Sequence, residues 1–191
     1  MIDSLFSAVP NAYLPLLEYN SRLDMLDLYN CGMTAKVYND LSGEACLLQK
    51  DSLHFLVQTT ASSSLEFQVL DGKSDTVYSC IRTVRMPEKQ SQVVFTNTRW
   101  RPIKIKLPKQ IGLEDCWFPN DSLSDDRIEN LRLALTPAYF HAHWECGKGQ
   151  SPVLVYEVSV EGLMPEDQKA AASCLKPLRF KWAKEKLMFE E

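Results

Sequence analysis

The chain has 191 residues, of which 45% are hydrophobic, and a formal net charge of −4 at pH 7. This composition supports one sizeable domain or two small ones. The acidic balance argues against a nucleic-acid binder, because neutralising phosphates requires a basic surface. The sequence also lacks the run of about 18 apolar residues that predicts a transmembrane helix, so we expect no membrane span.

The amino-terminal segment has an acidic residue, Asp3, and no basic region before its apolar residues. It is therefore unlike a signal peptide, and we expect a cytoplasmic protein. The six cysteines are widely spaced and form no CxxC pair. In a cytoplasmic chain this pattern predicts reduced thiols, most of them small core residues.

The first part of the chain is expected to be one helix followed by short strands. The helix is predicted over Pro15 to Asn30, because proline suits a first turn and Gly32 suits a helix stop. The clearest hairpin turns at Asp71 and Gly72, between two alternating runs. Further period-two segments lie at residues 34–40, 45–51, 53–60, 92–98 and 101–108. Six or seven such strands suggest a small antiparallel barrel or sandwich over residues 1–108.

The second part begins with an acidic stretch, residues 109–126, whose Gly, Pro, Asn and Ser content predicts a linker. A second domain is expected over residues 127–191. It combines a short helix from Arg127, strands at 138–146 and 153–163, and a helix at 165–175 that begins with Pro165. Residues 176–191 form either a strand or a continuation of that helix. The predicted fold class is mainly β with flanking helices, in two small antiparallel barrel-like domains, the second incomplete.

One strand carries His141, His143 and Glu145 at alternate positions, so that all three face the same way. Two histidines at i and i+2 have metal-ligand geometry, and Glu145 is the third donor that a metal-dependent enzyme would use. We interpret this strand as a half-buried polar face and predict no metal site. No catalytic residue is predicted, because nucleophile motifs and phosphate-binding glycine loops are absent.

Two further groups suggest a ligand. Arg127 and Arg132 lie five residues apart in "RIENLR"; their planar guanidinium groups suit phosphate oxygens, although two solvated arginines would look the same. Glu157 and Ser159 point the same way at the end of a strand, just before a turn at Gly162.

In this order, the two groups resemble a PilZ domain, which has an arginine-rich segment followed by (Asp/Asn)-x-Ser-x-x-Gly. Glu157 stands where the family has Asp or Asn, and Ser159 and Gly162 match. The motif resemblance covers residues 127–164, and the leading block looks like the amino-terminal barrel of flagellar-brake proteins. The resemblance implies a six-stranded β-barrel that binds cyclic di-GMP. Arg127 and Arg132 would grip phosphates and guanines, and Glu157 and Ser159 would contact a guanine edge. Ile128 replaces an arginine of many members, so we expect weak binding or none.

The predicted function is therefore a non-enzymatic bacterial signalling adaptor of divergent PilZ type. It would act on motility or biofilm functions through contacts with a protein partner that the sequence does not identify. Two alternatives stay open: an interaction protein of the same fold that binds no nucleotide, and a metal-dependent enzyme at the His-x-His strand.

Overall fold

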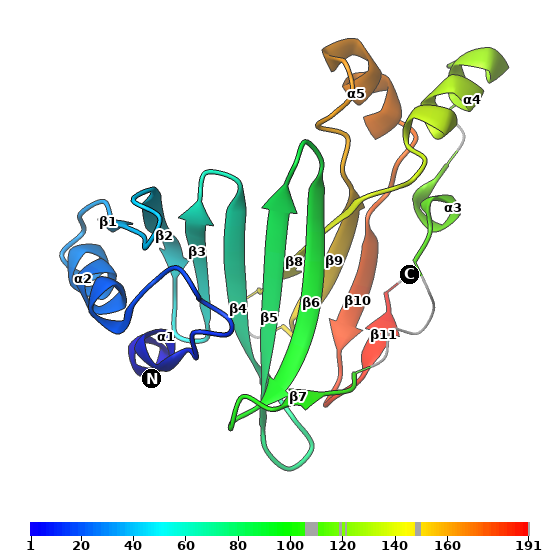
Figure 1. Cartoon of the computed structure of the whole chain (residues 1–191). Coiled ribbons are helices and arrows are strands. Elements are labelled where there is room, and N and C mark those ends of the chain that lie inside the picture. Colours follow the sequence, from blue (N-terminus) through cyan, green and yellow to red (C-terminus); the bar gives the residue numbers. More distant parts are fainter. Residues whose placement is uncertain (106–110, 119, 121, 148–149, 191) are drawn as a thin grey trace. The chain divides into compact units, whose positions relative to one another are not determined.

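The structure is a computed structural model that describes residues 1–105, 111–118, 120, 122–147 and 150–190. As predicted, it is mainly β, with two antiparallel sheets and a few flanking helices (Figure 1). The chain divides into two compact units. Unit 1 comprises Met1–Val84 and Gln92–Lys104, and unit 2 comprises Arg85–Ser91 and Ile105–Glu191.

Unit 1 is built on a sheet of seven strands that follow one another in chain order. The predicted hairpin is present: Asp71 pairs with Thr76, so its turn spans residues 72–75 rather than Asp71 and Gly72 alone. The strands are β1 (Lys36–Tyr38), β2 (Glu44–Lys50), β3 (His54–Thr60), β4 (Ser63–Asp71), β5 (Thr76–Arg85), β6 (Lys89–Asn97) and β7 (Pro102–Ile103).

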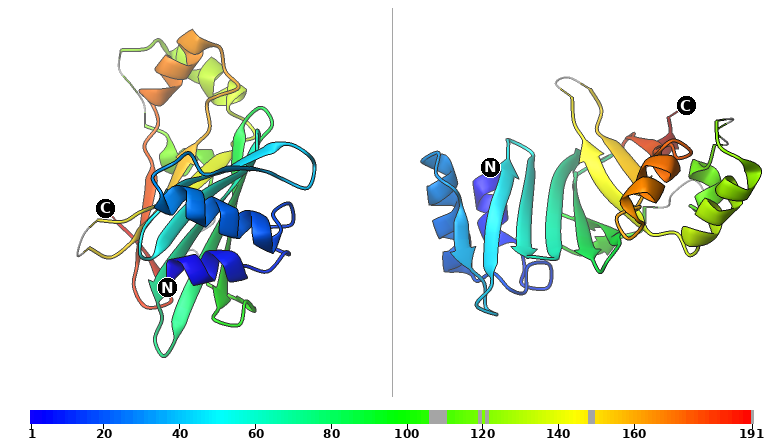
Figure 2. Two further views of the ribbon diagram at one scale, coloured as in Figure 1. Left: turned by 90° about the vertical axis from the view of Figure 1, so that its left-hand side faces the viewer. Right: turned by 90° about the horizontal axis from the view of Figure 1, so that it is seen from above.

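Two helices, α1 (Ile2–Ala8) and α2 (Tyr19–Asn30), pack on one face of this sheet (Figure 2). The core between them is aromatic: the ring of Phe55 lies 4.8 Å from that of Phe6 and 4.7 Å from that of Phe67. Burying such a side chain contributes about 1.5–3 kcal/mol to folding. Helix α2 ends at Asn30 as predicted, and Gly32 just beyond it has a φ of 72°, a conformation that glycine adopts without strain.

Helix α2 begins at Tyr19, later than the predicted Pro15, because a buried arginine takes up the carbonyl groups before it. Arg22 is 2% exposed. Its guanidinium donates to the carbonyl oxygens of Leu17 at 2.8 Å and Leu14 at 3.2 Å, and to Oδ1 of Asn11 at 2.8 Å. It also donates to the carbonyls of Ser7 and Val9. The chain before α2 thus folds around this side chain instead of forming a helical turn.

Unit 2 contains a sheet with the strand order β11-β10-β9-β8. One face is apolar and buried, with Trp144, Tyr156 and Phe180 among its residues. The strands are β8 (Phe140–Glu145), β9 (Val153–Val158), β10 (Leu178–Trp182) and β11 (Leu187–Phe189). The helices of this unit are α3 (Leu113–Cys116), α4 (Asp125–Ala134) and α5 (Pro165–Ala172).

Several expectations differ from this architecture. Neither sheet closes into a barrel within the described residues, since β1 and β7 flank one sheet and β8 and β11 flank the other. The expected linker, 109–126, contains α3 and the start of α4, and its Cys116 is fully buried; residues 109 and 110 lie outside the described ranges. For residues 176–191, where strand and helix were both left open, the structure has the strands β10 and β11.

The cysteines agree only in part with the expectation drawn from composition. Cys80, Cys116 and Cys174 are buried, whereas the other three are not, and burial raises the pKa of Cys80 to about 12. Among the helices of the described ranges, none is both long enough and apolar enough to cross a membrane.

Candidate metal centre on the sheet of unit 2

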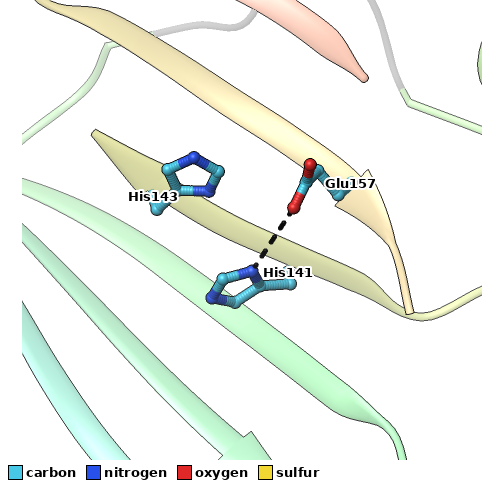
Figure 3. A group of neighbouring side chains, drawn as sticks. All are labelled: His141, His143 and Glu157. Carbon is cyan, nitrogen blue, oxygen red and sulfur yellow. Dashed lines mark ion pairs between the residues drawn. The ribbon is translucent and has the colours of Figure 1, made fainter. Parts of the chain in front are cut away.

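The polar face of the unit 2 sheet brings together two histidines and a glutamate. His141 and His143 alternate along β8 and therefore share a face. Strand β9 runs antiparallel to β8 in a register that pairs Glu157 with His141. Figure 3 shows the two rings and the carboxylate gathered on one side of the two strands. One potential ligand atom from each residue lies within 4.8 Å of the other two.

The two imidazole rings lie nearly parallel, with centroids 5.5 Å apart and an interplanar angle of 24°. Nδ1 of His141 lies 4.0 Å from Oε2 of Glu157 (Figure 3). The histidine side chains are 28% and 29% exposed, and that of Glu157 is 52% exposed. The group is thus partly sheltered but open to solvent on the glutamate side.

One ring nitrogen of His143 has no hydrogen-bond partner in the part of the chain that the structure describes. Its Nε2 lies 3.7 Å from Oε1 of Glu145. Its Nδ1 is buried and makes no hydrogen bond to any residue that the structure describes. Leaving a buried polar atom unpaired costs about 1–3 kcal/mol. An imidazole nitrogen with a free lone pair is the commonest protein ligand for a transition metal.

Glu145, the third donor expected from sequence, has a different partner, and this is a correction. Both of its oxygens accept hydrogen bonds from Arg179, at 3.2 Å and 2.7 Å. These bonds lower the pKa of the Glu145 carboxyl, and they raise the pKa of Arg179, which also binds Glu190. The residue that joins the histidines is therefore Glu157, from the neighbouring strand.

Two histidines and one carboxylate form a recognised donor set for Zn²⁺ and Fe²⁺ sites that keep an open coordination position. Bonds of about 2.0–2.2 Å to a tetrahedral ion would place the donor atoms about 3.3–3.6 Å apart. The present spacing, at most 4.8 Å, is wider than this by about 1.5 Å or less. Binding an ion would therefore require the three side chains to move closer together.

The residues predicted to bind cyclic di-GMP fall into separate places. Arg127 forms an ion pair with Asp167 of α5. Arg132 forms one with Glu114 of α3, and its guanidinium lies 5.8 Å from the ring centroid of Trp117. Both arginines are on α4, on a helix rather than a flexible approach. No hydrogen bond or ion pair described here joins them to Glu157, Ser159 or Gly162.

Ser159 and Gly162 instead bind the β5–β6 turn, which belongs to the same unit. Oγ of the buried Ser159 accepts a hydrogen bond from the backbone N–H of Lys89 at 2.9 Å. The N–H of Gly162 donates to Oε1 of Glu88 at 2.7 Å. Between them, Glu161 forms ion pairs with Arg85 at 2.8 Å and Lys89 at 2.7 Å. This cluster, which we call the turn clamp, gives both Ser159 and Gly162 contacts within the protein.

The metal group was missed from the sequence because Glu157 was assigned to the nucleotide. The sequence did contain the information needed to find this group. Residues at equal distances from the middle of a hairpin turn face each other, and the two strands on either side of the β8–β9 turn were predicted. Applying this rule places a residue near position 157 opposite His141.

Comparison with known proteins identifies a family without a described function. The chain matches the family described as "Protein of unknown function (DUF3256)" over residues 1–187. No curated protein matches it. A solved structure, described as a domain of an uncharacterized protein from Porphyromonas gingivalis W83, has the same fold. The TM-score is 0.73 at 24% identity, covering 99% of this chain and 97% of that one. Because the family match spans nearly the whole sequence, the chain belongs to the DUF3256 family.

Proposed function

We propose that this protein binds a divalent transition-metal ion, Zn²⁺ in the first instance, between His141, His143 and Glu157. The observation that carries the proposal is the buried Nδ1 of His143, which has no hydrogen-bond partner among the described residues. His143 belongs with His141 and Glu157 to a group of three close donor residues. An ion bound there accepts the lone pair of Nδ1 and removes the cost of burying it. Nδ1 of His141 and a carboxylate oxygen of Glu157 complete the donor set, and solvent occupies the open position.

A titration with Co²⁺ tests this proposal, since Co²⁺ takes the same ligands as Zn²⁺ and absorbs visible light. The chain is stripped with a chelator and titrated, and Zn²⁺ is then added to displace the Co²⁺. We expect one equivalent of Co²⁺ and its displacement by one equivalent of Zn²⁺. His141→Gln and Glu157→Gln should each lose most of the absorbance.

The matched control is His54→Gln, because His54 also lies beside a glutamate, Glu66, at 3.1 Å, but on the sheet of unit 1. It should bind Co²⁺ like the unaltered chain. The proposal fails if the unaltered chain binds no Co²⁺ or Zn²⁺, or if a chain with both His141→Gln and Glu157→Gln binds them equally well.

The second candidate is the non-enzymatic signalling adaptor of divergent PilZ type, with cyclic di-GMP as its ligand. One observation favours it: a hollow of about 410 Å³ beside α3 and α4 is bordered by Ile128 and Arg132, within the usual size of small-molecule sites. The side chains of Arg127 and Arg132 are 41% and 43% exposed, so their ion pairs are weak and a phosphate can replace the carboxylates. Glu114, Asp125 and Glu129 also line the hollow, and their charges oppose a phosphate ligand.

A further inference from the structure

We infer that Glu145, held in place by Arg179, positions His143 for the metal ion by fixing the proton on its Nε2. This inference rests on the proposed metal-binding function and deepens it. A neutral imidazole carries its proton on one nitrogen only, and the other nitrogen is then free to bind an ion. Since Nε2 of His143 faces the Glu145 carboxylate, a proton on Nε2 leaves the lone pair of the buried Nδ1 for the metal. A carboxylate on the far nitrogen is the usual partner of a metal-binding histidine.

The position of Glu145 is set by a chain of groups that crosses the sheet. In the strand register, both His143 of β8 and Arg179 of β10 pair with Val155 of the intervening strand β9. The two terminal nitrogens of Arg179 donate hydrogen bonds to the two carboxylate oxygens of Glu145. The Nε of Arg179 donates to Oε2 of Glu190 at 3.1 Å. A guanidinium fixed at both ends by carboxylates has little freedom to rotate. Glu190 thus holds Arg179 in place, Arg179 holds Glu145, and Glu145 in turn orients His143.

The alternative is that Glu145 and Arg179 form an ordinary surface ion pair. Their side chains are 47% and 35% exposed, and such pairs have little effect on folding. The two roles predict different consequences of removing Glu145. A surface pair affects neither metal affinity nor the proton position on His143, whereas a positioning group changes both with little loss of stability.

The test compares Glu145→Ala with the unaltered chain in two measurements. Zn²⁺ affinity, measured by competition with a chromophoric chelator, should fall about 10- to 100-fold, as is typical when the outer partner of a metal-binding histidine is removed. In the metal-free chain, ¹⁵N NMR of the imidazoles should show His143 protonated mainly at Nε2, and Glu145→Ala should shift the proton towards Nδ1. Glu145→Gln, which keeps an acceptor oxygen but not the charge, should give an intermediate affinity.

The matched control is Glu44→Ala, which removes the carboxylate of another exposed ion pair, that of Glu44 with Lys36 in unit 1. It should change neither measurement. If the unaltered chain binds Zn²⁺ and Glu145→Ala binds it equally tightly, the inference is wrong and the proposed function stands. A metal-free His143 protonated at Nδ1 would also overturn the inference. If the unaltered chain binds no metal, both fail.

Discussion

The backbone N–H of Gly162 donates to Oε1 of Glu88 at 2.7 Å, and a Cβ atom at position 162 would lie 2.3 Å from that same oxygen. Gly162→Ala should therefore push the Glu88 carboxylate away and break a charge-assisted hydrogen bond. Because the side chain of Glu88 can swing aside, we expect a loss of about 1–2 kcal/mol rather than a failure to fold. Urea denaturation followed by fluorescence measures this loss.

A double-mutant cycle separates this contact from an effect on the backbone. In a Glu88→Ala chain the obstacle is absent, so adding Gly162→Ala should cost much less than it does in the unaltered chain. Equal costs in the two backgrounds would show that Gly162 is needed for another reason, such as contact with a ligand.

Arg22 is a buried charged residue of unit 1 whose guanidinium donates to several backbone carbonyl groups. Replacing it with Met keeps the volume but leaves its buried acceptors without a donor, and each unpaired carbonyl costs about 1–3 kcal/mol. We expect Arg22→Met to destabilise unit 1 by about 3 kcal/mol or more, measured by urea denaturation. The stability of Arg22→Lys should lie between that of the unaltered chain and that of Arg22→Met. An ammonium group keeps the charge but cannot reach acceptors in so many directions.

The control for Arg22 is Arg82→Met. Arg82 also donates to a carbonyl of the segment before α2, that of Ala12 at 2.9 Å, but from an exposed side chain. Its loss should cost less than about 1 kcal/mol. If both variants lose the same stability, burial of the guanidinium is not what holds this segment.

Local chemistry explains which parts of the fold could be predicted. The end of α2 at Asn30, shortly before Gly32, and the start of α5 at Pro165 follow from rules that span a few residues, and alternation revealed the β4–β5 hairpin. Helix α1 was missed because it has only seven residues, and it is stabilised by packing Phe6 against a sheet formed later in the chain. The two antiparallel sheets were predicted, but neither closes into a barrel within the described residues, because alternation shows strands and not whether the outer strands meet.

The candidate site shows the same division between local and distant information. The shared face of His141 and His143 is a property of one strand and was predicted. The pairing of Glu157 with His141 depends on the length of a turn. The role of Ser159 and Gly162 depends on Glu88 and Lys89, about seventy residues earlier in the chain. A short motif cannot show whether its partner is a ligand or a distant turn.

Asp3 of α1 makes unit 1 sensitive to acid. Its carboxylate binds Nζ of Lys50 at 2.6 Å, and this hydrogen bond lowers the pKa of Asp3. Because the folded-state pKa lies below the unfolded value of about 3.9, the stabilisation is complete above that value and is lost as the pH falls through the folded-state pKa. Asp3→Asn should therefore cost about 0.5 kcal/mol near neutral pH, and this difference should shrink as the pH approaches about 2.

Urea denaturation of both chains across that pH range measures the effect. The matched background is Lys50→Met, in which the cation is absent and Asp3→Asn should change little at any pH. If the stability lost through Asp3→Asn stays constant with pH, the ion pair is not the source of that loss.

The hollow beside α4 makes the cyclic di-GMP prediction testable at two positions. Charge-assisted hydrogen bonds to phosphate contribute about 1.5–3 kcal/mol each, so Ile128 in place of an arginine should weaken binding about 10- to 100-fold. We expect calorimetric titration to show weak binding or none. If weak binding is seen, Arg132→Ala should abolish it. Ile128→Arg should strengthen it, because the new guanidinium would enter the hollow that Arg132 already borders.

Thermal denaturation of each variant must accompany the titration, since Ile128 also packs against the core formed by Leu131 and Leu135. Glu129→Gln provides a second route to the same result: it removes a carboxylate that lines the hollow without touching that core, and less repulsion should tighten phosphate binding. Tight binding that survives Arg127→Ala and Arg132→Ala together would place the nucleotide elsewhere on the protein. If instead no variant binds, the cyclic di-GMP proposal fails, and the metal group on the unit 2 sheet is left as the candidate for function.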